Sequence, residues 1–323
     1  MTERKPKPEG VDAAAKRVAE HVTRTPLLPL DWEGVRLWVK AECLQQGGSF
    51  KLRGATNRLL LLGEAERRRG VVAFSSGNHA QGVAIAARRL GIPATIVMPA
   101  DAPSVKVEGT RAAGAEIVFY DRAGESREAI GARLAAERGA TLVPSFDDVD
   151  VIEGQGSAGV EIAAQLGGSP DKVLVPCGGG GLSAGIALAL PEAHVVTVEP
   201  EGWDDMAASL AAGIPVPVRE PAPPTRCDAL QTRLVSPLTL GALHAAGASG
   251  ISVTEAEIEA AIAFAARALR IVAEPGGAVA LAALLAGKAG PVTERTVLVV
   301  SGGNVDPALY ARILAGQAAE TDR

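Results

Sequence analysis

The sequence predicts an α/β protein with doubly wound, mostly parallel sheets, because short β-branched segments alternate with alanine-rich segments along the chain. The first clear unit is a predicted strand at 70–74 followed by a helix at 78–90. A second unit has its strand at 94–98 and its helix at 104–113. Glycine-rich segments follow several predicted strands, and in such sheets ligands bind beyond the carboxyl ends of the strands. Together these observations predict a composite site formed by several strand ends.

The alternation continues through the rest of the chain. Thr254 and Glu257 have the spacing of a capping box, which predicts the start of a helix that runs to Ile271. The proline-rich segment 214–235 breaks the pattern and is expected to be an ordered excursion over the surface. The first ten residues are expected to form a loose tail. The other predicted elements are strands at 116–119, 172–175, 194–198 and 296–300, and helices at 125–137 and 183–190.

Composition argues against several classes of protein. The net charge of −5 and the aromatic content of 3% argue against nucleic-acid binding. Charged residues or glycine break the apolar stretches, so we expect no membrane span, and the charged N-terminus has no apolar signal segment. The three cysteines lack a metal-binding spacing and are expected to be buried thiols of a reduced, cytoplasmic protein.

Four consecutive glycines, Gly178 to Gly181, lie between a predicted strand and a predicted helix. Glycine leaves the backbone N–H groups unobstructed, and together with a helix N-terminus these groups can bind an anion. No GK[ST] signature follows, so the segment is not a Walker A loop, and it does not match the dinucleotide fingerprint. A cofactor monophosphate fits this arrangement, although a tight turn alone would also use glycine.

Lysine is rare in this chain, and Lys51 lies in an unusual context, GGSFKLRGA, next to glycines and Phe50. A partly desolvated lysine has a lowered pKa and can form a Schiff base, whereas an isolated lysine is usually a solvated surface charge. Pyridoxal phosphate needs two anchors, a lysine for its aldehyde and an anion site for its phosphate. The sequence therefore predicts this cofactor.

Two further glycine-containing segments carry polar side chains. SSGNH at 75–79 offers hydroxyl and amide groups at a helix start, which suits a carboxylate and a phenolic oxygen. A plain helix N-cap would use the same serines. Ser301, in SGGN after the last predicted strand, could place its hydroxyl on a pyridine nitrogen. Such a partner leaves the ring largely unprotonated, which favours elimination over long-lived carbanions.

These motifs resemble those of the fold-type II pyridoxal phosphate enzymes, which have a tryptophan synthase β-like fold, over roughly residues 10–317. Within that group the chain is similar to the serine/threonine dehydratase and serine racemase family. SSGNHA, where cysteine synthases typically carry TSGNTG, indicates this branch. The matching segments are GGSFKLRGA around Lys51, SSGNHAQG at 75–82, VPCGGGGLSAG at 175–185, VEPEGWDD at 198–205 and LVVSGGNVD at 298–306.

The resemblance implies roles for individual residues. Lys51 and Ser76 would be the catalytic residues, and Asn78 would bond the 3′-hydroxyl of the cofactor. The residues implied to bind the cofactor are Phe50, Lys51, Asn78, Gly178, Gly179, Gly180, Gly181, Leu182 and Ser301. The residues implied to surround the substrate are Ser75, Ser76, Asn78, His79 and Arg127.

The resemblance also implies a divalent cation site like that of racemase-like members. Its ligands would be the carboxylate of Glu199, the backbone carbonyl of Trp203 and the carboxylate of Asp205. Oxygen ligands fit Mg²⁺ or Ca²⁺ rather than Zn²⁺. The alternative is an acidic loop that caps the helix starting near Asp204. Such a metal would be structural or activating and would take no part in bond breaking.

The expected organisation is a large cofactor-binding domain, formed by residues 1–55 and 145–323, into which a small domain, 56–144, is inserted. Pro144 and Ser145 replace the His-Pro pair usual in threonine dehydratases, so the sequence departs from the family there. The resemblance further implies a homodimer or homotetramer.

The predicted reaction is α,β-elimination from L-threonine, L-serine or a related 3-hydroxy amino acid, giving a 2-oxo acid and ammonia, with freed Lys51 as general base. Three alternatives remain. A serine or aspartate racemase would use Ser76 as the acid on the opposite face. A 3-hydroxyaspartate dehydratase would need a cation for the distal carboxylate, and the sequence reveals none. A non-catalytic binding protein would have no need of a Schiff-base lysine.

Overall fold

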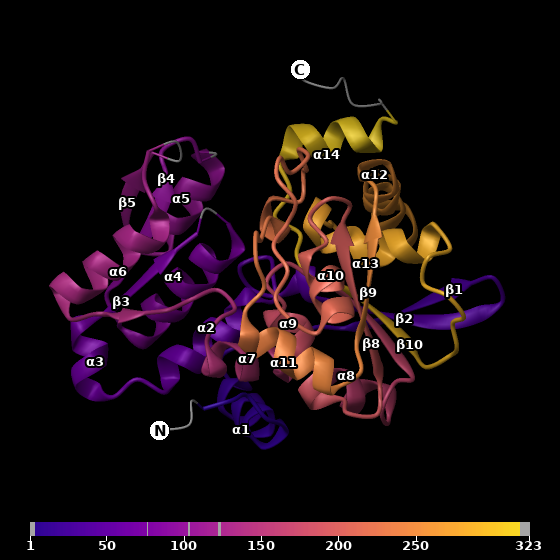
Figure 1. Ribbon diagram of the computed structural model, residues 1–323, viewed down its shortest axis with the longest axis horizontal. Coiled ribbons are helices and arrows are strands. Elements are labelled where there is room, and N and C mark those ends of the chain that lie inside the picture. The colour runs from indigo at the N-terminus through magenta and orange to yellow at the C-terminus, as the bar shows by residue number, and fades with distance from the viewer. Residues whose placement is uncertain (1–3, 76, 103, 122–123, 317–323) are drawn as a thin grey trace.

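The computed structural model describes residues 4–75, 77–102, 104–121 and 124–316, which form two lobes, each built around its own sheet (Figure 1). The larger sheet has six strands, of which β1 and β2 pair antiparallel while the other neighbours pair in parallel. In order across the sheet, the strands are β1 (Leu27–Trp32), β2 (Val35–Ala41), β10 (Thr296–Val300), β7 (Lys172–Pro176), β8 (His194–Pro200) and β9 (Ser249–Val253).

The smaller sheet has four parallel strands and forms the lobe on the left of Figure 1. All four strands fall within the predicted insertion, 56–144, although the exact limits of that domain stay a prediction. In order across the sheet, the strands are β5 (Glu116–Tyr120), β4 (Ala94–Pro99), β3 (Val71–Phe74) and β6 (Thr141–Leu142).

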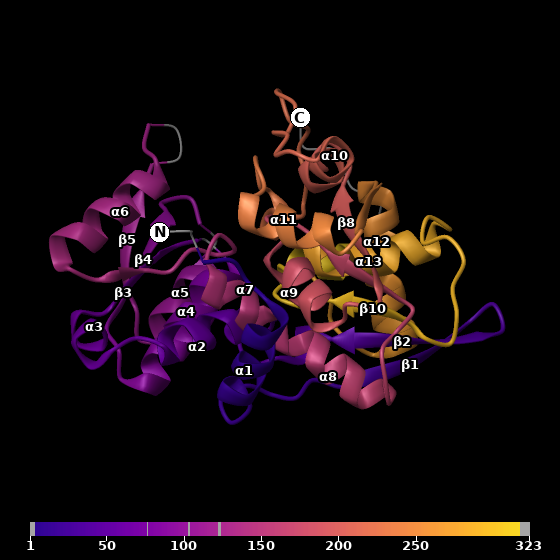
Figure 2. The same cartoon turned by 60° about the horizontal axis from the view of Figure 1, so that its bottom comes forward.

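Helices cover both sheets, as the alternating pattern predicts, and Figure 2 shows them on the two faces of the molecule. The strands and helices predicted up to residue 200, and the strand predicted at 296–300, lie within two residues of their expected ends. The α-helices are α1 (Pro8–Val18), α2 (Lys51–Leu60), α3 (Glu64–Arg69), α4 (Asn78–Leu90), α5 (Ser104–Ala112), α6 (Arg127–Arg138), α7 (Val149–Gln155), α8 (Ser157–Leu166), α9 (Gly181–Ala189), α10 (Asp205–Ala212), α11 (Pro237–Ala245), α12 (Glu255–Phe264), α13 (Pro275–Leu285) and α14 (Pro307–Leu314).

Helix α2 lies where the two lobes meet, since it packs on α4 of the smaller lobe and on α7 of the larger one. Glycine makes the second contact possible, because a Cβ on Gly54 would lie 2.7 Å from the carbonyl oxygen of Val151. Gly154 has the same role on α7, where a Cβ would lie 2.7 Å from the Cα of Gly54. The first residue of α2 is Lys51, so this packing sets the place of that amine.

The prediction that the first ten residues form a loose tail is wrong from Arg4 onward. Helix α1 already begins at Pro8, a residue whose fixed φ suits the first helical turn. Before it, Arg4 binds the carboxylates of Asp150 and Glu153 at 2.5 Å each, so the acidic face of α7 holds this segment in place.

The helix predicted from Thr254 is present with its capping box. Thr254 Oγ1 accepts the N–H of Glu257 at 3.2 Å, and the Glu257 carboxylate accepts the N–H of Thr254 at 2.7 Å. The helix does not run regularly to Ile271, however. The α-helix ends at Phe264 and continues as a short π-helix, η3 (Ala265–Leu269). The helical segment stops before Ile271 because Arg270 adopts a left-handed conformation with φ of +58°.

The proline-rich segment is an ordered excursion, as predicted. Its backbone is tied down at several points, for example by the N–H of Val218 on the carbonyl of Arg233 at 3.0 Å. The indole N–H of Trp203 also donates to the carbonyl of Pro223 at 2.8 Å. Elsewhere, the three cysteines are buried and unpaired, as expected. Among the described residues, no helix is both long and apolar enough to cross a membrane.

Candidate active site

The carboxyl end of β10 and the segment before α2 form one wall of the site. Ser49 makes an antiparallel bridge with Gly302, and the N–H of Phe50 donates to the carbonyl of Ser301 at 3.1 Å. Two segments that the sequence presents as separate motifs, about 250 residues apart, therefore touch immediately before Lys51. This contact supports the prediction that several strand ends share one site.

Lys51 points into the junction of the lobes. Its Nζ donates to the carbonyl of Ser145 at 3.1 Å and lies 5.1 Å from the centre of the Phe50 ring. Burial lowers the pKa of Lys51 to about 8, although the negative charge of Glu274 acts to raise it. At pH 7 about one-tenth of an amine with this pKa is unprotonated, far more than for an ordinary lysine, and the unprotonated form is the one that attacks an aldehyde.

Asn78 begins α4 and is held from two directions. Its Nδ2 donates to Glu274 Oε1 at 2.5 Å, and its Oδ1 accepts from Asn304 Nδ2 at 2.8 Å. Both partners come from the larger lobe, whereas Asn78 belongs to the smaller one. The predicted cofactor ligand is therefore fixed by contacts that cross between the lobes.

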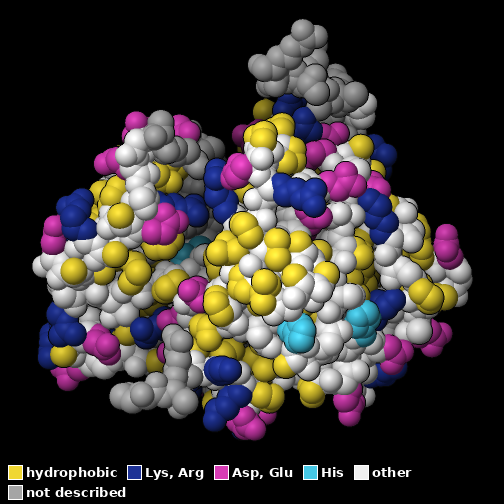
Figure 3. All heavy atoms as spheres, in the orientation of Figure 1, with side chains coloured by type: hydrophobic (Ala, Val, Ile, Leu, Met, Phe, Trp, Pro, Cys, Tyr) yellow, Lys and Arg dark blue, Asp and Glu magenta, His cyan; other side chains and the backbone are white. Residues whose placement is uncertain are grey.

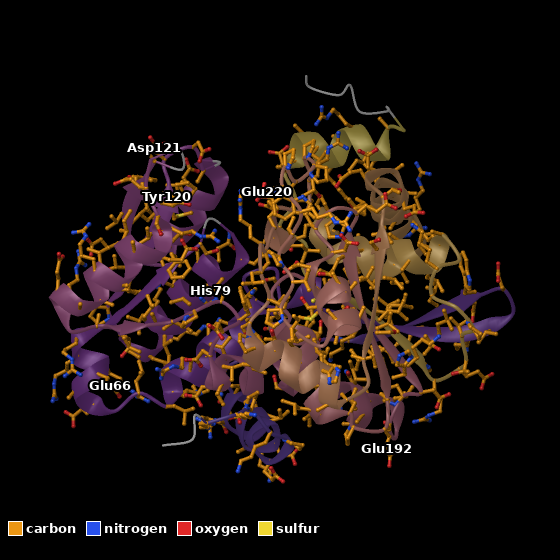
Figure 4. The ribbon with its side chains drawn as sticks, viewed as in Figure 1. Glu66, His79, Tyr120, Asp121, Glu192 and Glu220 are labelled. Carbon is orange, nitrogen blue, oxygen red and sulfur yellow. The ribbon has the colours of Figure 1, made fainter. Side chains whose placement is uncertain are left out.

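His79 is a neutral imidazole. Its Nε2 lies 2.8 Å from the carbonyl of Val143 and must carry the proton, because a carbonyl only accepts. Burial, followed by the nearby charge of Lys51, lowers the pKa of His79 to about 3. Its Nδ1 is buried without a hydrogen-bond partner in the described structure. Figure 4 labels His79 in the smaller lobe on the side facing the larger one, and Figure 3 shows the surface hollowed between the lobes.

The four glycines form the turn from β7 into α9, as predicted for an anion site. Gly180 has φ of +84°, and α9 starts at Gly181. Side chains are excluded here, because a Cβ on Gly179 would lie 2.3 Å from the Phe146 ring. In the described part of the chain, no carbonyl oxygen accepts the N–H groups of Gly178 to Leu182. Buried N–H groups without such a partner at a helix N-terminus fit a phosphate.

The structure places the predicted serines unequally. Ser75 follows β3, and its hydroxyl accepts the N–H of Gly77 at 3.1 Å, which is a local turn. Ser76 lies outside the described residues. Ser301 is 4% exposed at the end of β10, next to Phe50, which places it on the wall described above.

Arg127 is the first residue of α6 and is exposed. Its guanidinium lies 5.8 Å from the centre of the Phe74 ring, which immediately precedes Ser75. The ion pair that Arg127 forms with Glu128 at 2.8 Å is solvated, with both side chains more than two-fifths exposed. Such a pair contributes little stability, so a substrate carboxylate can compete for Arg127.

The predicted cation ligands surround the start of α10. Both carboxylate oxygens of Asp205 are buried without a hydrogen-bond partner in the described structure, and burial raises the pKa of Asp205 to about 7. Glu199 is fully buried and accepts the N–H groups of Met206 and Ala207. The described residues contain no cluster of three His, Cys, Asp or Glu side chains, but the third predicted ligand is a carbonyl, that of Trp203. The unpartnered oxygens of Asp205 fit a divalent cation.

Sequence reasoning missed several residues that contact this site. Glu274 and Asn304 hold Asn78, Ser145 accepts from Lys51, and Phe146 covers the glycine turn. Asn304 lies in a motif already singled out, and its rarity was a usable signal. Glu274 offered none, since a Glu before Pro275 resembles an ordinary residue at a helix start.

These features fit an enzyme that holds an aldehyde cofactor on a lysine and a phosphate on glycine amides. The sequence profile of the family described as pyridoxal-phosphate dependent enzyme matches residues 18–303, and the chain belongs to this family. The predictions of the family, of the fold type and of pyridoxal phosphate as cofactor are thereby confirmed. The residues present fit the cofactor, which when bound supplies an electron sink for the amino-acid Cα.

Relatives and solved structures cover almost the whole chain. The L-threo-3-hydroxyaspartate ammonia-lyase of Pseudomonas sp is 44% identical over 94% of this chain and 97% of its own. The protein of the same name from Saccharomyces cerevisiae is 39% identical over 94% of this chain and 95% of its own. The structure of maize serine racemase superposes with a TM-score of 0.89 at 35% identity, covering 97% of this chain and 98% of that one.

Proposed function

We propose that this chain is a pyridoxal-phosphate dependent ammonia-lyase whose substrate is L-threo-3-hydroxyaspartate. The observation that carries the proposal is the pair of relatives of that name, at 44% and 39% identity over 94% of the chain. An ammonia-lyase for 3-hydroxy amino acids is also the main prediction from the sequence. The relatives favour its hydroxyaspartate alternative over L-threonine or L-serine.

The structure supplies a candidate for the cation that this substrate needs. The distal carboxylate of 3-hydroxyaspartate requires a positive partner, which L-serine and L-threonine do not. The guanidinium of Arg127 lies 5.8 Å from the centre of the Phe74 ring. Its acidic partner in the described structure, Glu128, is solvated and competes weakly for it. A guanidinium can bind a carboxylate with two parallel hydrogen bonds.

The other residues have separate tasks in the proposed reaction. Lys51, whose pKa burial lowers to about 8, would be the base for the proton on Cα, and the bound cofactor would supply the electron sink. The start of α4, with Ser75, Asn78 and His79, would hold the α-carboxylate at a helix N-terminus. The β-hydroxyl would leave as water, and the enamine product would tautomerise to an imine, which water hydrolyses to oxaloacetate and ammonia.

The test is a substrate panel read by release of 2-oxo acid. We expect kcat/KM for L-threo-3-hydroxyaspartate to exceed that for L-serine and L-threonine. Arg127→Gln should raise KM for 3-hydroxyaspartate roughly tenfold, as expected for one charged hydrogen bond, and leave KM for L-serine unchanged. Arg133→Gln, on the same helix and also paired with a solvated Glu, is the control. Equal loss on both substrates, or faster turnover of L-threonine, would exclude this assignment.

A serine racemase activity is the second candidate, supported by the similarity to maize serine racemase. It requires an acid on the face opposite Lys51, and Ser76 is the residue implied by the family resemblance. Chiral analysis of L-serine incubated with the enzyme tests it. Ser76→Ala should abolish racemisation and retain elimination, and absence of D-serine from the parent enzyme would remove this candidate.

Three further expectations remain predictions. We infer a divalent cation, Mg²⁺ or Ca²⁺, at Asp205, supported by its unpartnered oxygens, with Glu199 and Trp203 as the other ligands. The protein is expected to be a homodimer or homotetramer, which sedimentation would establish. A cytoplasmic location agrees with three buried, unpaired thiols.

A further inference from the structure

Glu274 is a buried carboxylate that the proposed reaction does not use. It is 3% exposed and stands immediately before Pro275, the first residue of α13. A residue at this position usually caps its own helix, but the Glu274 side chain makes no cap hydrogen bond. Its carboxylate turns toward the smaller lobe instead, where Oε1 accepts from Asn78 Nδ2 at 2.5 Å.

The backbone around Glu274 is shaped to admit this carboxylate. A Cβ on Gly302 would lie 2.0 Å from Glu274 Oε1, so only glycine leaves room for it. The N–H of Glu274 also donates to the carbonyl of Gly302 at 3.0 Å, which fixes the main chain of one against the other. The carboxylate therefore lies beside Ser301 and on the same wall as Lys51.

Asn304 holds the opposite end of the Asn78 carboxamide. Its Nδ2 donates to Asn78 Oδ1 and to the carbonyl of Gly47, both at 2.8 Å. The carbonyl of Gly47 can only accept, so it determines which end of Asn304 faces Asn78. Gly48 makes room for this side chain, because a Cβ there would lie 2.2 Å from Asn304 Oδ1.

The two contacts permit a single orientation of the Asn78 carboxamide. A carboxylate has no proton to donate, so Nδ2 of Asn78 must face Glu274, and Oδ1 must face Asn304. One N–H of Asn78 is then engaged by Glu274, and the other has no acceptor among the residues that the structure describes. If the carboxamide were turned over, its oxygen would face the Glu274 carboxylate, which is unfavourable in a buried site.

We propose that Glu274 is a positioning residue that fixes the carboxamide of Asn78 so that its second N–H faces the 3′-oxygen of the cofactor. The inference rests on the proposed function and on the role that the family resemblance implies for Asn78, a hydrogen bond to that oxygen. Without Glu274, the carboxamide can turn over and present its own oxygen to the cofactor oxygen. The cofactor would then bind less tightly and its ring would have a different electronic environment.

The test is a double-mutant cycle on cofactor binding, using the full-length chain titrated with pyridoxal 5′-phosphate and followed by absorbance of the bound cofactor. Glu274→Leu should weaken cofactor binding roughly tenfold or more, as for loss of one charged hydrogen bond, and should shift the absorbance maximum of bound cofactor. Glu274→Gln keeps an acceptor for Asn78 and should bind within about threefold of the parent. In an Asn78→Ala background, Glu274→Leu should have less than about a twofold effect.

The control is Glu153→Gln, which should leave cofactor binding unchanged. The Glu153 carboxylate is as buried as that of Glu274 but has Arg4 as its partner. If Glu274→Leu does not fold, Asn304→Ala takes its place, because it removes the partner at the other end of the Asn78 carboxamide. It should weaken cofactor binding in the parent, and that loss should not add to the loss caused by Asn78→Ala.

Each outcome decides the matter. Parent-like binding and absorbance in Glu274→Leu would overturn the inference, and so would equal losses in the parent and Asn78→Ala backgrounds. A loss in Glu274→Gln as large as that in Glu274→Leu would show that charge, rather than the position of Asn78, is what matters. Asn78→Ala that binds as tightly as the parent would instead remove the proposed role of Asn78 itself.

Discussion

Arg53→Met tests the scaffold that holds Lys51, because Arg53 lies two residues later in α2 and its side chain is fully buried. Its guanidinium donates to both oxygens of Glu42, at 2.7 and 2.8 Å, and to both oxygens of Glu161, at 2.8 and 2.9 Å. Lys40, also fully buried, binds Glu161 at 2.6 Å. These charges join α2 to β2 and α8 behind the site.

The expected loss of stability follows from what Arg53→Met leaves behind. Glu42 is fully buried and would keep Thr25 Oγ1 as its direct hydrogen-bond partner. The remaining buried cation, Lys40, would have to balance both Glu42 and Glu161, so the two negative charges would be poorly compensated. Breaking a buried pair in this way costs about 3–5 kcal/mol, against a total stability of about 5–15 kcal/mol for a typical domain. Arg58→Met is the comparison variant on the same helix, because its pair with Asp148 is less buried, with side chains 19% and 17% exposed, and should cost less.

The loss should also depend on pH. Burial acts to raise the pKa of Glu42, but Arg53 outweighs it, and the pKa lies below its ordinary value. In the parent, this stabilisation is present above the ordinary pKa and is lost as pH falls through the lowered one. In Arg53→Met the pKa of Glu42 should be raised. Protonation of Glu42 at low pH then removes the uncompensated buried charge and recovers part of the lost stability. The difference in free energy of unfolding between the parent and Arg53→Met should therefore narrow as pH falls from 8 to 5.

Urea unfolding followed by circular dichroism measures both effects. Arg53→Met should lower the free energy of unfolding by about 3–5 kcal/mol at pH 8, and Glu42→Gln introduced with it should recover part of the loss. A loss below about 1 kcal/mol would refute the reasoning, because that is the size expected of a solvated pair.

Three further predictions concern the site itself. The rate at which the cofactor-free chain forms a borohydride-reducible Schiff base should rise between pH 7 and 9 and then level, because the pKa of Lys51 is about 8, and Lys51→Ala should form none. Gly179→Ala should weaken cofactor binding at least tenfold, since its Cβ would meet the Phe146 ring at 2.3 Å, and an absorbance titration measures it. Mg²⁺ should raise the melting temperature of the parent and have no effect on Asp205→Asn, and equal shifts in both proteins would place the cation elsewhere.

The sequence was informative wherever the chemistry is encoded locally. A glycine run between a strand and a helix predicts an anion site, and a rare lysine among glycines predicts a Schiff base, because both patterns rest on neighbouring residues. Glu274 could not be found in this way, because its partner Asn78 is 196 positions away and its own surroundings resemble a helix start. The partners of Arg53 are likewise distant, with Glu161 lying 108 residues further along.

Strands β1 and β9 escaped prediction for a related reason. β1 contains Pro29 and β9 contains Gly250, and both residues are disfavoured in strand interiors. Both strands are at the edges of the larger sheet, where one side of each needs no ladder partner. These residues are tolerated because both strands lie at the edges of the sheet. The position of a strand in a sheet is known only from the assembled fold, so the sequence alone does not reveal it.

Lys51 and Asn78 come from different parts of this fold, and this explains why the contacts between lobes matter. Lys51 is held by the larger lobe through the charges around Arg53 and the close packing of Gly54 on α7. Asn78 belongs to α4 in the smaller lobe and reaches the larger one through Glu274 and Asn304. Helices α2 and α4 also pack directly on each other, and a Cβ on Gly82 of α4 would lie 3.0 Å from the carbonyl carbon of Lys51. The spacing between the reactive amine and α4 is therefore set by this packing, and the Glu274 carboxylate acts on the orientation of the Asn78 side chain at the start of α4.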